Sequence, residues 1–262
     1  MKTALVTALL VLSPLFAQPQ QTADVMEVVN REAGLEMKFR TPSSEYLRLH
    51  LKQVGTGEQA GRKLMRYSFS VKGLPTTEAY SLMTWDLGEK EPGAAIRGLK
   101  LDANGVLRCG PKAGDCPDAE PGSELIVSVT GMLGQPRRFV LSDSKKPVAM
   151  GEVVPFPAYG TDGACSIEAV MLTSDGKGVL LFGKGFQPGE QLSILNTAFG
   201  ELSKMEEQAT DKGEYISLLL PFVEGHQEGT TSIEVSGSKC RPATSFNWGS
   251  YREEMVDSKP KT

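Results

Sequence analysis

The sequence has little of what metal and catalytic sites need. It contains two histidines and four cysteines in 262 residues, and it lacks the G-x-S-x-G and H-E-x-x-H patterns of common hydrolases. Neither half has the close ligand pairs that zinc sites use. Asp102-Ala103-Asn104-Gly105 begins like a calcium loop, but the later acidic positions are missing, so we interpret it as a hairpin turn. We therefore expect no metal, no cofactor and no catalytic residues.

The chain also lacks an excess of positive charge, because 28 Lys and Arg stand against 32 Asp and Glu and the formal net charge is −4. The tight basic doublets, Arg137-Arg138 and Lys145-Lys146, are too few for a phosphate-binding track. We therefore expect no nucleic-acid partner.

Long apolar runs are absent beyond the start of the chain. Residues 4 to 16 are apolar, follow Lys2, are interrupted by Pro14 and lead to Ala17. This run is shorter than the ~18 residues that a membrane span needs, and its layout is typical of a secretory signal peptide. We expect residues 1 to 17 to be a signal peptide, no transmembrane segment, and a secreted or periplasmic protein.

Helical periodicity is almost absent after residue 40, whereas period-two alternation recurs. Leu47, Leu49 and Leu51 alternate with polar residues, and turn residues separate many such segments. This pattern predicts an all-β chain. The exception is a short helix at residues 22 to 33, which we expect to end at Gly34 and to pack on the first domain.

The chain repeats itself. Residues 72 to 88 match residues 184 to 200 at an offset of 112, and Val127 and Val129 match Ile233 and Val235 at an offset of 106. Two tandem copies of one β unit account for both offsets. The predicted organisation is as follows: signal peptide 1 to 17, N-terminal segment with short helix 18 to 42, β-sandwich domain 43 to 156, linker 157 to 164, β-sandwich domain 165 to 250, disordered tail 251 to 262.

The stretch Gly183-Lys184-Gly185-Phe186-Gln187-Pro188-Gly189-Glu190 raises the question of a phosphate-binding loop. Such a loop leads into a helix, whereas residues 191 to 197 are predicted to form a strand, so we interpret it as a turn between strands. The stretch resembles the G-x-G-F-x-P-G-E turn of bacterial immunoglobulin-like and IPT/TIG-type β-sandwich repeats, in which the aromatic residue plugs the core. The resemblance implies two tandem immunoglobulin-like sandwiches and no particular activity.

The four cysteines of an exported protein allow three pairings. Cys109 and Cys116 lie in the first copy, and Cys165 and Cys240 lie in the second. We expect disulfides within each copy, because the alternative, a zinc site, lacks suitable ligand spacing.

These observations favour a non-enzymatic exported protein that binds an unidentified protein or glycan of the cell envelope or is itself an envelope component. One alternative is a hydrolase that uses His226 with Glu224 or Glu228, since His50 is expected on a strand surface. Another is a periplasmic chaperone, although the strand at residues 147 to 155 that would cap a subunit is short and broken by Gly151.

Two loops are expected to carry the binding. Residues 109 to 122 and residues 221 to 230 are predicted to occupy equivalent places in the two copies, at one end of each sandwich.

Overall fold

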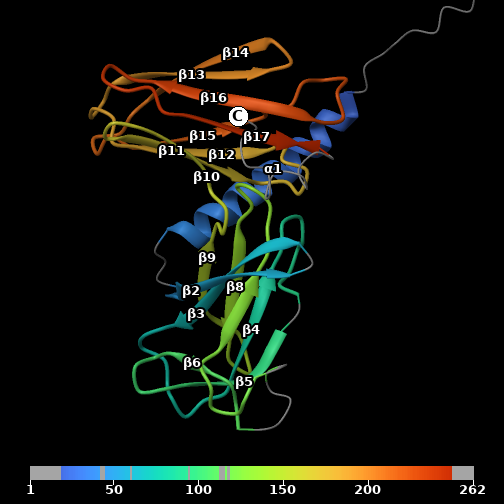
Figure 1. The fold of residues 1–262 in the computed structure, drawn as a ribbon, viewed down its shortest axis with the longest axis vertical. Helices are drawn as coiled ribbons and strands as arrows, with labels where there is room; N and C mark the ends of the chain where they lie inside the picture. Colours follow the sequence, from blue (N-terminus) through green and yellow to red (C-terminus); the bar gives the residue numbers. More distant parts are fainter. Residues whose placement is uncertain are drawn as a thin grey trace, which may run out of the picture.

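The computed structural model describes residues 19–41, 45–59, 61–93, 95–111, 116 and 119–249, and over this part the chain is mostly β (Figure 1). The predicted signal peptide at residues 1 to 17 and the predicted tail at residues 251 to 262 lie outside it. No helix among the described residues is long and apolar enough to cross a membrane.

Helix α1 (Pro19–Arg40) is longer than predicted and does not end at Gly34. Its middle packs through Val29 on Leu172 and Leu180, and its end packs through Phe39 on a separate cluster with Val140 and Met150. The predicted packing on the first unit is present, but the helix is longer than predicted and packs on the second unit as well. A glycine inside a helix costs about 1 kcal/mol, and packing on both sides of Gly34 offsets this cost.

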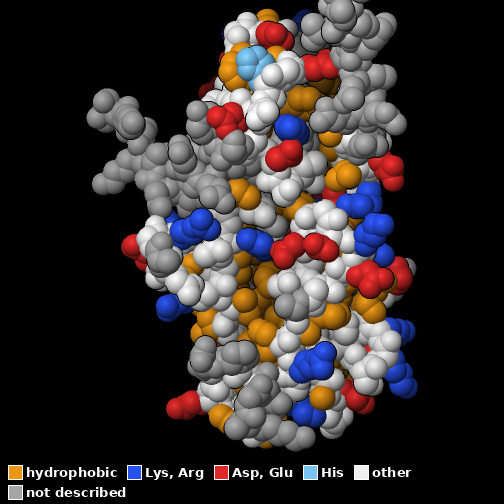
Figure 2. All heavy atoms as spheres, turned by 90° about the vertical axis from the view of Figure 1, so that its right-hand side faces the viewer, with side chains coloured by type: hydrophobic (Ala, Val, Ile, Leu, Met, Phe, Trp, Pro, Cys, Tyr) orange, Lys and Arg blue, Asp and Glu red, His pale blue; other side chains and the backbone are white. Residues whose placement is uncertain are grey.

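The first β unit comprises β1 to β9. Its strands are β1 (Leu47–Arg48), β2 (His50–Gln59), β3 (Arg62–Ser70), β4 (Tyr80–Trp85), β5 (Ala95–Leu101), β6 (Leu107–Arg108), β7 (Ile126–Val129), β8 (Arg137–Ser142) and β9 (Pro147–Val153). They form a sheet of order β1-β9-β8-β4-β5-β6 and a smaller sheet of order β2-β3-β7. Phe69 of β3 and Phe139 of β8, with ring centroids 4.9 Å apart, join the two sheets in one core. Figure 2 shows hydrophobic side chains gathered on one face of this unit, in the lower half of the view, with charged side chains along its sides.

The second β unit comprises β10 to β17. Its strands are β10 (Ala158–Asp162), β11 (Cys165–Met171), β12 (Val179–Lys184), β13 (Gln191–Ala198), β14 (Glu201–Gln208), β15 (Tyr215–Leu219), β16 (Gly229–Ser236) and β17 (Ala243–Trp248). Sheets of order β10-β11-β12-β15 and β14-β13-β16-β17 form a sandwich, whose core includes Leu181 from one sheet and Val235 from the other.

The linker predicted at residues 157 to 164 is instead mostly strand. β10 pairs with β11 from Ala158↔Ala169 to Asp162↔Cys165. Ala158 and Gly160 are buried, and Gly160 lies against the Ala243 backbone of β17. The prediction failed because glycine and proline were interpreted as loop residues, whereas this glycine allows two strands to approach closely.

The two units share a glycine turn. Gly105 and Gly213 have left-handed backbone conformations, with φ of 78° and 70°. Their carbonyl oxygens accept hydrogen bonds from the N–H groups of Val71 and Phe186, at 2.9 and 3.2 Å. A Cβ at either glycine would collide with the carbonyl of that same partner, so both turns require glycine.

The units also share a strand register. Ser81 of β4 lies opposite Ser142 of β8, and Ser193 of β13 lies opposite Ser236 of β16. Ser81 and Ser193 are separated by the offset of 112 that the sequence predicts. β8 is therefore the counterpart of β16.

The offset of 106 was wrong. It aligned Val127 and Val129 with Ile233 and Val235, but the two valines lie on β7, which pairs with β3 in the smaller sheet, whereas Ile233 and Val235 lie on β16, which pairs with β13. Alternating valines occur on any half-buried strand, so the sequence pattern did not distinguish β7 from β16.

The two loops predicted to be equivalent are not. Residues 109 to 122 lie between β6, which pairs with β5, and β7, which pairs with β3. Residues 221 to 230 lead from β15 in one sheet to β16 in the other. The two segments therefore connect different pairs of strands.

Candidate functional site

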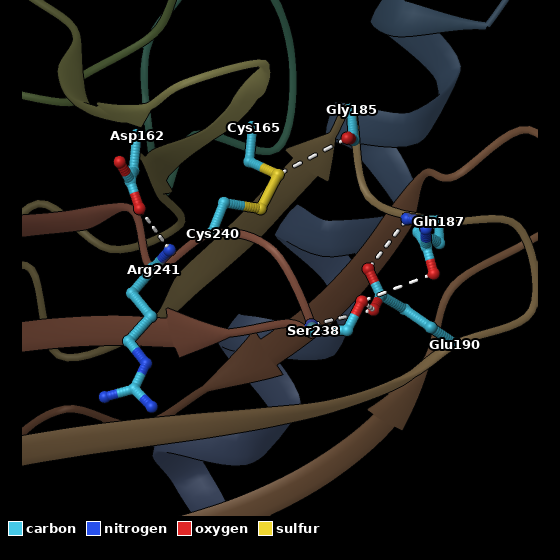
Figure 3. Close-up of a disulfide and its surroundings, with 8 residues drawn as sticks. All are labelled: Asp162, Cys165, Gly185, Gln187, Glu190, Ser238, Cys240 and Arg241. Atoms are coloured by element: carbon cyan, nitrogen blue, oxygen red, sulfur yellow. Dashed lines mark hydrogen bonds between the residues drawn. A yellow bond between two sulfur atoms is a disulfide. The ribbon is translucent and has the colours of Figure 1, made fainter.

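The cysteines form disulfides within each unit. Cys109 is bonded to Cys116 and Cys165 to Cys240, with Cα atoms 5.6 and 6.2 Å apart, and no described cysteine is free. In Figure 3 the second bridge joins the start of β11 to the loop before β17, and the Cys165 sulfur lies 3.3 Å from the carbonyl oxygen of Gly185.

The glycine-rich stretch after β12 is a turn between strands, as predicted. Phe186 is buried and packs edge-on against Tyr215 with ring centroids 5.5 Å apart. Glu190 fixes the turn, because its carboxylate accepts hydrogen bonds from the N–H of Gln187 at 2.7 Å and from the hydroxyl of Ser238 at 2.7 Å (Figure 3). The carboxylate and amides that a ligand would need are already used within the fold.

The histidines lie apart from each other. His50 is exposed on β2, opposite Ser70. His226 lies in the loop before β16, where its ring stacks on Phe199 with centroids 3.9 Å apart and an interplanar angle of 23°. The contact of its ring with Phe199 is aromatic rather than acid–base.

A groove of about 590 Å³ lies on the second unit, beyond the end of α1. Its floor is the outer face of the sheet β10-β11-β12-β15, on which α1 packs at Leu180, and the groove begins beside half-buried Phe182. Tyr159 and Ile216 stand 49% and 46% exposed along the groove. The apolar side chains of the groove are thus exposed because α1 ends before it covers them.

Charged side chains flank this apolar surface. The Arg40 guanidinium at the end of α1 lies 4.3 Å from the centroid of the Phe182 ring. Glu168 is beside it on β11, and Lys184 and Glu214 are exposed further along the groove. The groove therefore offers aromatic and aliphatic contact together with both signs of charge.

A buried ion cluster lies behind the groove, where α1 meets both units. Arg138 of β8 donates to Glu32 at 2.7 Å, to Glu36 at 2.8 Å and to Glu152 of β9 at 3.4 Å. The side chains of Arg138, Glu32 and Glu36 have no exposed surface. These bonds join the helix to the first unit.

Arg40 extends the cluster to the second unit. Its Nε donates to Glu36 at 2.7 Å and to Glu152 at 3.2 Å, and its Nη1 donates to Glu168 of β11 at 3.2 Å. Although burial lowers the pKa of Arg40, the hydrogen bond to Glu168 and the charges of Glu36 and Glu152 raise it overall. Arg40 therefore stays charged and holds helix and both units together.

Two glutamates of the cluster have opposite pKa shifts. Burial raises the pKa of Glu152 well above its ordinary value, and the nearby charge of Glu36 raises it further. Burial alone would raise the pKa of Glu36, but a hydrogen bond with Glu152 and the charges of Arg138 and Arg40 lower it. The interaction between the two carboxylates thus moves their pKa values in opposite directions.

The comparisons with known proteins give no family. No protein family and no curated protein match the sequence. Among solved structures, a tetra-tandem repeat in the extending region of a large adhesion protein is similar at 12% identity over 77% of this chain and 48% of that one, with a TM-score of 0.25. A DUF3823 family protein from Bacteroides ovatus is similar at 8% identity over 77% and 97%, with a TM-score of 0.22.

A third similar structure is a Ca²⁺-stabilized adhesin that helps an Antarctic bacterium bind ice, at 15% identity over 71% of this chain and 43% of that one, with a TM-score of 0.19. This chain thus spans about half the length of the first of these structures and less of the third. TM-scores this low support no argument about function.

The groove and the ion cluster were missed by sequence reasoning. One signal was available: Glu32, Glu36 and Arg40 recur every four residues and would share one face of a longer helix. The partners Arg138, Glu152 and Glu168 carry no comparable local pattern.

Proposed function

We propose that the chain is an exported, non-enzymatic binding protein of two tandem immunoglobulin-like domains. The shared glycine turn and serine register support duplication of one domain. Two disulfides support export, because disulfides persist in oxidising compartments, as does the predicted signal peptide at residues 1 to 17.

The observation that carries the binding role is the groove beside α1. Half-exposed Tyr159 and Ile216 are aromatic and branched aliphatic anchors of the kind that protein partners bury. Lys184 and Glu214 place opposite charges near these anchors. A protein segment with an apolar side chain between charged ones matches this chemistry, whereas a neutral glycan would use Tyr159 and leave both charges unpaired.

The alternatives receive less support. A hydrolase built on His226 needs a nucleophile held beside the imidazole, whereas the contact that the structure gives this ring is the stacking on Phe199. A chaperone of the expected type requires a free edge on the last strand of the first unit, whereas β9 pairs with β8 along its length and with β1 at Ala149 and Met150.

The test is selection of binders on the wild-type chain from a displayed peptide library and, in parallel, from a glycan array. Selected peptides are then measured by calorimetry against the double variant Tyr159→Ser/Ile216→Ser. We expect affinity to fall at least about tenfold, because anchor residues carry most of the binding energy.

Val54→Ser is the matched control, since Val54 is 44% exposed on β2 of the first unit and lies outside the groove. It should leave peptide affinity unchanged, and the melting temperatures of all variants should agree within a few degrees. Equal binding by the groove variant would reject the groove, and binders from the glycan array alone would reject a protein partner.

A further inference from the structure

Strand β14 is an unusually exposed sheet edge. It pairs with β13 over its whole length, from Gln191↔Gln208 to Ala198↔Glu201, and it is the last strand of its sheet. All its residues except Glu207 are exposed, including Leu202 at 65%. Figure 1 shows it as an outer strand of the second unit. An edge of this length is a template for pairing with another chain.

The turn before β14 determines which backbone groups point away from the sheet. Phe199 and Gly200 both have left-handed backbone conformations, with φ of 51° and 79°, as in the two-residue turn of a tight hairpin. Ala198 and Glu201, which flank this turn, form its closing hydrogen-bonded pair. Hydrogen-bonded and non-bonded pairs then alternate along the ladder.

The far end of the hairpin follows the same alternation of hydrogen-bonded and non-bonded pairs, since the Ala209 N–H donates to the Glu190 carbonyl at 3.0 Å. The residues of β14 whose backbone groups face solvent are therefore the even-numbered ones: Leu202, Lys204, Glu206 and Gln208.

In one register, these residues face residues of complementary charge or polarity when β14 pairs with β14 of a second copy. Antiparallel pairing about a two-fold axis at Met205 places Lys204 opposite the partner's Glu206, and Leu202 opposite the partner's Gln208. A shift of the axis by one residue places either Lys204 opposite the partner's Lys204 or Glu206 opposite the partner's Glu206, and like charges directly opposite are destabilising.

We propose that β14 pairs with β14 of a second copy of this chain in that register. The sheet β14-β13-β16-β17 then continues across the two-fold axis into the partner's sheet, and neither copy keeps a free β14 edge. The solvent-facing backbone groups of β14 bond across the axis, and Met205, 36% exposed, packs on the partner's Met205.

Charges on edge strands usually prevent pairing. Here Lys204 and Glu206, both more than half exposed and 3.0 Å apart within one strand, select a partner with the same sequence. The β14 edge and the groove lie on different sheets of the unit, so pairing at β14 does not depend on binding in the groove.

The test is sedimentation velocity over a range of concentrations of the full chain. The wild type should form dimers. Lys204→Glu and Glu206→Lys should each weaken self-association at least about tenfold, because each places two like-charged pairs across the axis. An equimolar mixture of the two variants should recover dimers, since every pair across the axis is then Lys with Glu.

The register is tested by crosslinking. Residues at a non-bonded antiparallel pair have Cα atoms about 4.5 Å apart, within disulfide reach, so two copies of the Met205→Cys variant should become joined by a disulfide at this position on oxidation. Ser203→Cys, opposite the partner's Glu207, should not crosslink. A wild type that stays monomeric, a mixture that stays monomeric, or equal crosslinking of the two cysteine variants would each overturn the proposal.

Discussion

Arg138 of β8 donates through Nη2 to Oε2 of Glu36 on α1 at 2.8 Å, and neither side chain has any exposed surface. Breaking such a buried pair leaves an uncompensated charge in the interior, so the loss of either partner destabilises the fold. Since Arg40 continues the same network to Glu168 of β11, the charges hold α1 against both units.

The first prediction concerns this pair and its neighbour in sequence. Arg138→Ala should lower the free energy of unfolding by about 3–5 kcal/mol, because Glu32 and Glu36 remain buried without their main counter-charge. Arg137→Ala should cost no more than about 1 kcal/mol, since Arg137 pairs with Asp86, whose side chain is 56% exposed. Denaturant unfolding of both variants provides the measurement, and similar costs would refute the role given to the cluster.

Sequence reasoning succeeded where structure depends on local pattern. Alternation at Leu47, Leu49 and Leu51 predicted a strand, and Leu47 lies on β1 and Leu51 on β2. The glycine turn at Gly185 was recognised because a following strand excludes a phosphate loop. Each of these inferences uses residues within a few positions of one another.

Sequence reasoning failed where structure depends on contacts between distant segments. Gly34 looks like a helix end, yet Val29 on one side of it packs on Leu172 and Phe39 on the other side packs on Val140. The groove was missed for the same reason, since the end of α1 and strands of the second unit line it together. Alternation alone did not identify a partner strand, and so β7 was equated with β16.

The second prediction concerns pH. The pKa of Glu152 is raised above its ordinary value of 4.5 by burial and by Glu36, so the folded state binds a proton that the unfolded state releases. Stability from this group is therefore present below about pH 4.5 and is lost as pH rises toward the folded pKa, by at most about 1.4 kcal/mol per pH unit. Glu36, whose pKa is lowered, has the opposite effect below pH 4.5.

Glu152→Gln tests this prediction, because glutamine can donate to the Glu36 carboxylate without titrating. As the pH rises above about 4.5, the free energy of unfolding of the wild type should fall relative to that of Glu152→Gln. Urea unfolding at several pH values gives the two curves, and parallel curves would show that Glu152 does not retain a proton in the folded protein.

The third prediction compares the two disulfides. Cys165 and Cys240 close a loop with a sequence separation of 75, and Cys109 and Cys116 one of 7. By the loop-closure relation, replacing the first pair with alanine should cost about 4 kcal/mol and the second about 2 kcal/mol. Calorimetric melting of the two double variants should show the larger loss for Cys165→Ala/Cys240→Ala, and the reverse order would contradict the prediction.

The fourth prediction separates two glycines of one turn. Gly185 and Gly189 both have left-handed backbones, with φ of 85° and 70°, so alanine is strained at either position by about 1 kcal/mol. At Gly185 an added Cβ would also collide with the carbonyl of Ala164, whereas no atom lies within 4 Å of that position at Gly189. Gly185→Ala should therefore cost at least about 1 kcal/mol more than Gly189→Ala in denaturant unfolding. Equal costs would mean that the backbone at Ala164 moves away from the added methyl group. The contact between position 185 and the Ala164 carbonyl would then not be the reason for glycine at this turn.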